Sequence, residues 1–176
     1  MRIIELFETH TGFQLFVDLD GVLADFDSGK NQIIKGTPSE KQKSEFWKTL
    51  HSFSYEEIED WWANLGMAPG GEILWSYVSK FHPIILSSPD ISKGCREACE
   101  KGKLRWIKKH LHPSPSSVII TKDKWKHASR FNILIDDRTK VLIPWEEHGG
   151  VGIHYETGNP KKAIKELIDR FGFPKK

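Results

Sequence analysis

Two aspartates one residue apart, Asp18 and Asp20, follow a short apolar run at residues 15–17, and Gly21 comes directly after them. A buried strand that ends in acids and breaks at a glycine is typical of the start of an α/β domain, where ligands bind beyond the carboxyl ends of the strands. Residues i and i+2 of a strand project to the same side, roughly 7 Å apart at a rise of ~3.3 Å per residue, so both carboxylates can face one ligand. Two acids this close repel each other and need a cation or a shared proton. The pair indicates half of a metal-assisted phosphoryl-transfer site.

Polar residues also follow three other short apolar runs, which are further strands of the expected sheet. The pairs are Ser87 and Ser88 after residues 83–86, Thr121 and Lys122 after residues 118–120, and Asp136 and Asp137 after residues 132–135. In a parallel sheet all of these ends open on one side. Phosphoryl transfer needs this combination of carboxylates for a metal, hydroxyls for an oxyanion and lysines for charge neutralisation, because its catalysis is mostly positioning and electrostatic stabilisation.

The elements that must position these residues follow from the apolar pattern. Short apolar strands alternate with helical segments, which indicates a mostly parallel sheet covered on both faces. We expect strands at residues 13–19, 83–86, 118–120, 132–135 and 151–153. We expect helices at residues 22–36, 72–80, 92–110 and 160–171, the last with Pro160 near its start. Residues 1–12 could form an edge strand or a short lead-in. The expected fold class is α/β, a Rossmann-like three-layer domain.

Residues 39–67 differ from the rest of the chain in their many aromatic residues among charged ones. Spacings of three and four predict two short amphipathic helices, and Ser39 can cap the first. Aromatic residues at such spacing are usually core residues. A segment this small has a limited interior, so some rings could instead face a shared cleft and stack on a planar ligand. We expect a core of about residues 1–24 and 70–176, with a helical cap inserted at about residues 25–69.

Composition bounds the class of protein. A chain of 176 residues suits one domain, and seven Trp with ten Phe add large buried areas to a hydrophobic fraction of 38%. The formal net charge of +2 is too small to argue for a polyanionic partner by itself. No apolar run approaches the ~20 residues of a membrane span. The first eight residues carry acids and lack a long apolar region, which argues against a signal peptide and favours a cytoplasmic protein.

The two cysteines, Cys95 and Cys99, stand four residues apart, with His110 and His112 downstream. Zinc sites more often use cysteine pairs two to four residues apart with histidine pairs three to five apart. The spacing of the cysteines favours i and i+4 neighbours on one side of a helix. We therefore interpret both as reduced, structural cysteines rather than as zinc ligands.

The motifs match a known family in order. Residues 18–22, Asp-Leu-Asp-Gly-Val, resemble the first motif of the haloacid dehalogenase-like (HAD) hydrolases. Ser87, Lys103 and the pair Asp136 and Asp137 resemble the other three motifs, and the resemblance covers residues 13–158. It implies a three-layer parallel sheet of the HAD type with a small helical cap inserted after the first strand.

A closer resemblance is to the 5'(3')-deoxyribonucleotidases of that superfamily. The similar stretches are residues 20–26, Phe46 with Trp47, Pro69 with Gly70, Ser88 with Pro89, and residues 103–106, 121–124 and 135–138. Ser87 and Ser88 stand where that group often has Thr-Ser, which keeps the hydroxyl. Lys122 stands where an Arg can occur, which keeps the charge but loses bidentate geometry. Residues 1–12 have no counterpart.

The resemblance implies a role for each motif residue. Asp18 would attack phosphorus and become a phospho-aspartate, and Asp20 would protonate the leaving oxygen and then deprotonate the attacking water. The cofactor would be Mg²⁺, bound by Asp18, the backbone carbonyl of Asp20 and Asp137, with Asp136 acting through water or a hydrogen bond. Ser87 and Lys103 would hold the phosphoryl oxygens.

The same resemblance implies a small-molecule nucleotide as the partner. Phe26, Phe46 and Trp47 would line the base pocket, with Trp61 or Trp62 nearby. Ser88 and Lys122 are candidates for further phosphate or sugar contacts. The oligomeric state stays open, and a dimer is compatible with the sequence.

Three other functions stay open from the sequence. The same chemistry could act on a sugar phosphate or on the 3' end of a nucleic acid, which the basic residues 101–109 would serve. A nucleotide-binding module with a degraded site is a second alternative, although every motif position is occupied. A nucleic-acid-binding protein that uses residues 101–109 with the aromatic residues is a third.

Overall fold

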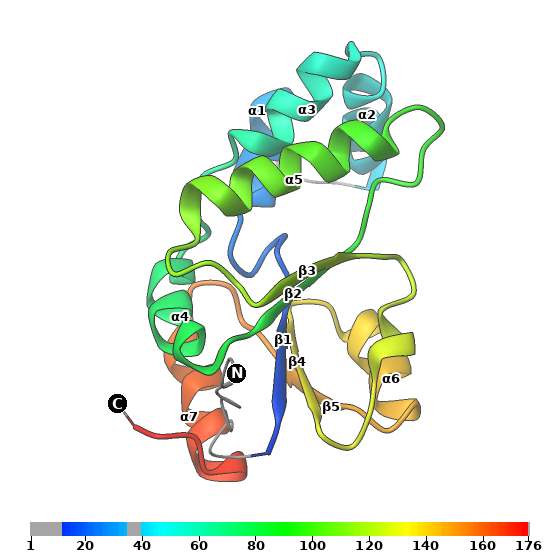
Figure 1. Ribbon diagram of the computed structural model, residues 1–176. Helices are drawn as coiled ribbons and strands as arrows, with labels where there is room; N and C mark the ends of the chain where they lie inside the picture. The colour runs from blue at the N-terminus through cyan, green and yellow to red at the C-terminus, as the bar shows by residue number, and fades with distance from the viewer. Residues whose placement is uncertain (1–11, 35–39, 176) are drawn as a thin grey trace, which may run out of the picture.

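The computed structural model describes residues 12–34 and 40–175, and Figure 1 shows how their elements are arranged. The strands are β1 (Gln14–Val17), β2 (Ile84–Ser87), β3 (Ser117–Ile120), β4 (Asn132–Asp136) and β5 (Val151–His154). The helices are α1 (Phe26–Ile33), α2 (Glu40–Leu50), α3 (Tyr55–Ala63), α4 (Gly71–Val78), α5 (Arg96–His110), α6 (Thr139–Glu147) and α7 (Pro160–Phe171). Two short 3-10 helices, η1 (Ser79–Phe81) and η2 (Lys124–His127), complete the described elements.

The described strands form one parallel sheet in the order β3-β2-β1-β4-β5. The strand order reverses direction at β1, the central strand, and crevices at such switch points are where ligands bind in open α/β sheets. Val17 of β1 is level with Ile85 of β2 and Ile135 of β4, so the residues after these strands meet at one edge. The predicted Rossmann-like α/β fold with a parallel sheet is confirmed.

Successive side chains of β1 point to opposite faces of the sheet, so the core is divided into two layers. Leu15 and Val17 belong to the larger cluster, which includes residues of α4 and α7. Phe16, between them, packs on the other face against Trp145 of α6, with ring centroids 5.5 Å apart. Figure 1 shows α4 and α7 on one flank of the sheet and α6 on the other. The sheet is therefore covered on both faces, which explains its continuous apolar strands.

Helices α1, α2, α3 and α5 lie together beyond one end of the sheet (Figure 1). A glycine lets α5 approach α3 closely, because a Cβ on Gly102 would lie 2.4 Å from the backbone oxygen of Glu59. Arg105 of α5 forms ion pairs with Glu59 and Asp60, at 2.8 and 2.7 Å. The predicted cap segment, residues 25–69, thus packs on a helix from the predicted core.

Some helices begin at residues other than those predicted from the sequence, because tight turns and capping side chains set where they start. The helix expected from residue 22 begins at Phe26, because residues 19–24 form a turn in which the backbone oxygen of Leu19 accepts the N–H groups of Leu23 and Ala24. The Asp25 side chain then caps α1 by accepting the N–H of Ser28. Helix α6 was not predicted, and it contains a proline at position 144.

Some predictions lie outside the described residues, namely the cap role of Ser39 and the structure of residues 1–11. Among the described helices, none combines the length and apolar character needed to cross a membrane.

Candidate active site

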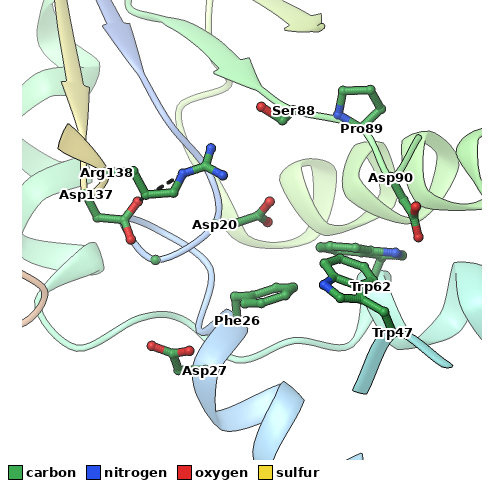
Figure 2. Close-up of a pocket in the computed structure, with 11 residues that line it drawn as sticks. Asp20, Phe26, Asp27, Trp47, Trp62, Ser88, Pro89, Asp90, Asp137 and Arg138 are labelled. Carbon is green, nitrogen blue, oxygen red and sulfur yellow. Dashed lines mark ion pairs between the residues drawn. The ribbon is translucent and has the colours of Figure 1, made fainter. Parts of the chain in front are cut away.

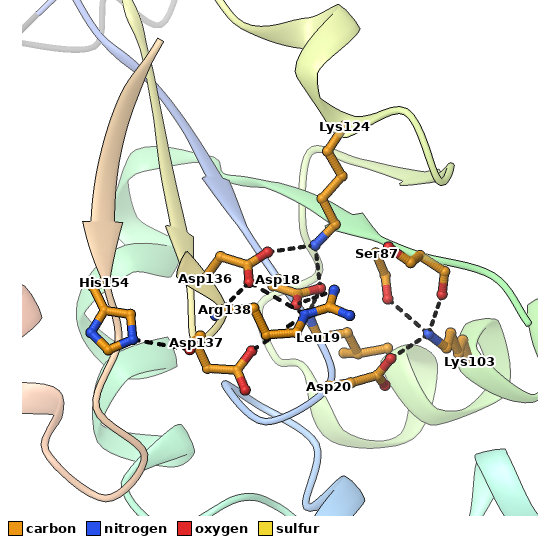
Figure 3. A network of polar contacts seen from close by, with 11 residues as sticks. Asp18, Leu19, Asp20, Ser87, Lys103, Lys124, Asp136, Asp137, Arg138 and His154 are labelled. Carbon is orange, nitrogen blue, oxygen red and sulfur yellow. Dashed lines mark hydrogen bonds and ion pairs between the residues drawn. The ribbon is translucent and has the colours of Figure 1, made fainter. Parts of the chain in front are cut away.

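The ends of β1 and β4 bring three carboxylates together (Figure 3). Asp18 and Asp136 follow paired residues of neighbouring strands, and the N–H of Asp18 donates to the backbone oxygen of Ile135 at 2.9 Å. Both aspartates are fully buried. Asp18, Asp136 and Asp137 each offer one oxygen, and these oxygens lie within 4.8 Å of one another. The parallel register thus builds the acidic cluster from residues 118 positions apart in the sequence.

Two cations balance this cluster. The Lys124 Nζ lies 2.7 Å from Asp18 Oδ1 and 2.7 Å from Asp136 Oδ2, and its side chain is only 2% exposed. The Arg138 guanidinium lies 3.6 Å from Asp18, 3.7 Å from Asp136 and 3.9 Å from Asp137. Buried charges persist only when they are paired and hydrogen-bonded, so Lys124 and the two buried aspartates act as one unit.

A second buried cation, Lys103, holds the other carboxylate of the first motif. Its Nζ lies 2.5 Å from Asp20 Oδ2, 2.9 Å from Ser87 Oγ and 2.6 Å from the backbone oxygen of Ser88. These contacts use all three ammonium donors. The Lys103 ammonium also lies 4.6 Å from the centre of the Trp62 ring. Burial alone would lower the pKa of Lys103, but the neighbouring Asp20 carboxylate raises it above the ordinary value.

The acids of the cluster differ in their pKa values. Burial opposes ionisation of Asp18, but Lys124 and Arg138 outweigh it and lower the pKa of Asp18. Burial and the charge of Asp18 raise the pKa of Asp136 to about 6 and that of Asp137 to about 7. Asp18 is therefore the most readily ionised member of the cluster, while the pKa values of its two neighbours lie closer to neutrality.

Gly21 allows the turn after β1 to approach Asp137. Its φ of +79° lies in the left-handed region that favours glycine, and a Cβ there would lie 2.5 Å from Asp137 Oδ2. The turn is closed by a hydrogen bond from the Gly21 N–H to the backbone oxygen of Ala24, at 2.9 Å. The glycine of the first motif is thus required by both backbone conformation and space.

A cavity of about 210 Å³ extends from the edge of this site to the helical layer (Figure 2), and Asp18 and Asp136 are not among the residues that line it. One end carries Asp20, Asp137 and Arg138, which we call the charged end. The other end carries the rings of Phe26, Trp47 and Trp62, which we call the ring end, with Ser88, Pro89 and Asp90 also on the wall. The rings of Phe26 and Trp62 stack at 5.6 Å with an interplanar angle of 27°. The cavity therefore pairs a charged end with an aromatic one.

The structure brings together some of the predicted substrate-binding residues and not others. Phe26, Trp47, Trp62 and Ser88 line the cavity. Phe46 is 1% exposed and packs in the core against Phe26, and Trp61 lines a different surface pocket together with Phe53. Lys122 is exposed and is not among the residues that line the cavity. The roles of all these residues stay predictions.

Sequence reasoning did not select Lys124 or Arg138 as site residues. Both lie in stretches on which the sequence resemblance was based. Lys124 is two residues after Lys122, and Arg138 directly follows Asp137. Lys122 and Lys124 offer the same charge just beyond β3, so the sequence presents them as equivalent candidates. His154 is a further addition, since its Nε2 lies 3.0 Å from the backbone oxygen of Asp137. Asp90 also lines the cavity and had not been selected.

The acidic cluster fits a hard divalent cation. Asp18 Oδ2 and Asp137 Oδ1 are buried oxygens without a hydrogen-bond partner among the described residues, although Arg138 lies 3.6 and 3.9 Å from them. Asp20 Oδ1 is a third such oxygen. An all-oxygen donor set with few protein ligands and room for water is the kind that Mg²⁺ occupies.

Comparison with known proteins supports the fold. No protein-family model matches the sequence, and no curated protein matches it. The chain is similar in structure to a HAD-superfamily hydrolase from Ehrlichia chaffeensis, with a TM-score of 0.52 and 12% identity over 89% of this chain and 97% of that one.

Two further solved structures are similar at lower TM-scores. An uncharacterized protein from Corynebacterium glutamicum gives 0.47 with 18% identity, over 93% of this chain and 97% of that one. A HAD family enzyme from Bacteroides thetaiotaomicron, solved as a magnesium complex, gives 0.46 with 14% identity, over 83% and 94%. The likeness to the Ehrlichia chaffeensis protein, together with the parallel sheet, shows that this chain has the fold of a HAD-superfamily hydrolase.

Proposed function

We propose that this protein is a Mg²⁺-dependent phosphatase that hydrolyses deoxyribonucleoside monophosphates. The observation that carries the proposal is the position of Asp18, a fully buried carboxylate held ionised at the end of the central strand. An ionised carboxylate beside paired cations is an effective nucleophile toward phosphorus, because the cations reduce its repulsion of an anionic ester.

The reaction proceeds in two steps that use both aspartates of the first motif. An Asp18 oxygen attacks phosphorus, the ester P–O bond breaks, and Asp20 gives its proton to the leaving oxygen. The resulting phospho-aspartate is then attacked by a water molecule whose proton returns to Asp20, which releases phosphate and regenerates Asp18. Oδ1 of Asp20 is the atom suited to carry this proton, because Oδ2 is held by Lys103 at 2.5 Å.

The remaining charged residues position and neutralise the phosphoryl group. Lys124 keeps Asp18 oriented and compensates its charge, while Lys103 and Ser87 face the phosphoryl oxygens from the side of Asp20. Mg²⁺ held by Asp18, Asp137 and the Asp20 carbonyl, with Asp136 behind, would supply further charge stabilisation for the phosphoryl oxygens. Arg138 covers Asp18 Oδ2 at 3.6 Å, so the guanidinium moves aside when phosphorus approaches.

The ring end supports a nucleotide as the substrate. The rings of Phe26, Trp47 and Trp62 offer flat apolar walls at the opposite end of the cavity from Asp137. Stacking on such rings binds any nucleobase, since every base has a π face. We propose that residues 25–69 act as the cap that places these rings over the charged end.

The charges of α5 argue against a nucleic-acid substrate. Arg105 is paired with Glu59 and Asp60, and Lys101 with Glu97. Two of the basic residues that could contact a phosphate backbone are thus balanced within the molecule, which weakens the electrostatic attraction that such binding requires.

The experiment is phosphate release, measured with Mg²⁺, from deoxyribonucleoside monophosphates, a sugar phosphate and a 3'-phosphorylated oligonucleotide. We expect the mononucleotides to give the highest kcat/KM, and Asp18→Asn to lower it about a thousandfold or more. Asp169→Asn, an exposed acid of α7 paired with Lys165, is the matched control and should leave the rate unchanged. A preference for the oligonucleotide or the sugar phosphate would contradict the substrate, and an active Asp18→Asn variant would contradict the nucleophile.

A further inference from the structure

A second group of potential metal ligands lies outside the strand-end cluster. His51 follows the end of α2, Asp90 lies in the loop after β2, and Cys95 lies directly before α5. Their ligand atoms lie within 4.8 Å of one another, and His51 Nε2 is 2.8 Å from Asp90 Oδ2. Three separate segments thus bring an imidazole, a carboxylate and a thiol to one point.

Neighbouring contacts already hold two of these side chains in place. Asp90 is 7% exposed, and its Oδ1 accepts the N–H of Ser92 at 2.9 Å, which leaves Oδ2 facing His51. The His51 ring packs beside the Trp47 ring, with centroids 5.5 Å apart. Contacts of this kind orient ligands before a metal binds, and metal sites depend on them nearly as much as on the ligands themselves.

The third side chain, Cys95, is a buried thiol without a strong partner. It is 5% exposed and not in a disulfide, and its Sγ reaches the backbone oxygen of Lys93 only at 4.0 Å. Burial and the charge of Asp90 raise the pKa of Cys95. A divalent cation would take up the negative charges of both groups, because a carboxylate, a thiolate and a neutral imidazole leave the site uncharged overall.

An open position and an entry path are also present. A pocket lined by Trp47, His51, Pro89, Asp90, Ile91 and Ser92 lies next to the cluster. Three protein ligands with room for a water in the fourth position are the arrangement of an open zinc site.

We propose that His51, Asp90 and Cys95 form a second metal site, which takes a zinc-type transition-metal ion rather than Mg²⁺. Thiolate and imidazole ligands favour ions such as Zn²⁺ and Co²⁺, whereas Mg²⁺ prefers an all-oxygen set. The bound ion would tie the end of α2 to the loop after β2. Since Trp47 lies in the last turn of α2, four residues before His51, the site would also hold one wall of the ring end.

The test is titration of the metal-free, reduced protein with Co²⁺, followed by near-ultraviolet absorption, where a thiolate bound to cobalt gives a charge-transfer band. We expect the band to saturate at one equivalent, to disappear when Zn²⁺ is added and to persist when Mg²⁺ is added. Cobalt bound at the aspartates of the strand ends gives no such band, because that site has no sulfur ligand.

Matched variants identify the ligands. Cys95→Ser should abolish the band. Cys99→Ser should keep it, although Cys99 is also buried, lies one turn further along the chain and accepts the N–H of Asp90 at 3.3 Å. His51→Gln, at a partly exposed position, should weaken Co²⁺ binding by about tenfold or more. The absence of a thiolate band in the folded wild-type protein, its survival in Cys95→Ser or its loss in Cys99→Ser would each overturn the proposal.

Discussion

The two ends of the cavity are built by different means. Asp20 and Asp137 of the charged end follow Asp18 and Asp136, which are placed by the register of β1 and β4, a ladder of backbone hydrogen bonds that leaves little freedom. At the ring end, Phe26, Trp47 and Trp62 come from three helices and are placed by contacts between rings. The comparison indicates that the charged end is fixed by the fold, whereas the ring end can change shape with a few side chains.

The two ends also differ in what a substitution removes. The charged end consists of buried charges that neutralise one another, so the loss of one partner leaves the others uncompensated. The ring end consists of apolar surface, where a smaller side chain loses contact area without leaving a charge unpaired. We therefore expect large effects on turnover at the charged end and smaller effects on substrate binding at the ring end.

Apart from Asp18→Asn, the largest expected effect comes from Lys124→Met. Removing this ammonium leaves Asp18 and Asp136 without their 2.7 Å partner, so we expect kcat/KM for phosphate release to fall about a hundredfold or more. The free energy of unfolding should also fall, by about 3 kcal/mol, as for other broken buried pairs. Phosphate release and urea unfolding measure the two effects.

Lys122→Met provides the comparison for this prediction. It removes the same charge two residues away, but from an exposed side chain, so we expect a change in kcat/KM of less than about threefold, as for a screened surface charge. An equal or larger loss in Lys122→Met would restore Lys122 as the substrate contact and would place Lys124 in a structural role.

The sequence predicted the charged end better than the ring end for a physical reason. Because side chains alternate between the two faces of a strand, acids that directly follow a strand face a predictable side. Parallel pairing of β1 and β4 then brings Asp18 and Asp136 together. Beyond β3 this rule stops, because the chain enters the 3-10 helix η2 at Lys124, and the sequence has no signal for that turn. This is why the pattern could not choose between Lys122 and Lys124.

The ring end was harder to predict because neighbouring helical residues point in different directions, about 100° apart at 3.6 residues per turn. Phe46 and Trp47 are adjacent in α2, yet the first is a core residue and the second lines the cavity. Trp61 and Trp62 are also adjacent, in α3, yet Trp61 lines the separate surface pocket and Trp62 lines the cavity. Aromatic content predicts that rings gather in this segment, but only the packing of α1 to α3 decides which rings face the ligand.

A smaller effect is expected from Trp47→Leu at the ring end. The shorter side chain removes one flat wall, so we expect KM for a deoxyribonucleoside monophosphate to rise about tenfold, while kcat changes little. Trp61→Leu, which alters the same type of residue in the neighbouring helix α3 but outside the cavity, should change KM less than about twofold. Steady-state kinetics below the unfolding temperature of both variants measure the difference. Equal shifts in KM would mean that the rings act through the packing of the helices and not by touching the substrate.

The smallest expected effect is on the stability of the fold, because protons and Mg²⁺ compete for the carboxylates of Asp136 and Asp137. The pKa values of Asp136 and Asp137 are raised to about 6 and about 7 in the folded protein, from 3.8. The folded state therefore binds more protons than the unfolded state between about pH 4 and 7, and the free energy of unfolding of the metal-free protein rises as the pH falls through this window.

Magnesium should reverse this dependence, because it binds the ionised carboxylates and competes with the protons. We expect Mg²⁺ to raise the thermal midpoint by several degrees at pH 8 and by much less at pH 5.5. Asp137→Asn is the control, since it removes one of the two raised pKa values and a metal ligand, and should flatten the difference between the two pH values. The difference between wild type and variant is the quantity that reports on the cluster. An equal effect of Mg²⁺ at both pH values would show that the cation binds away from Asp136 and Asp137.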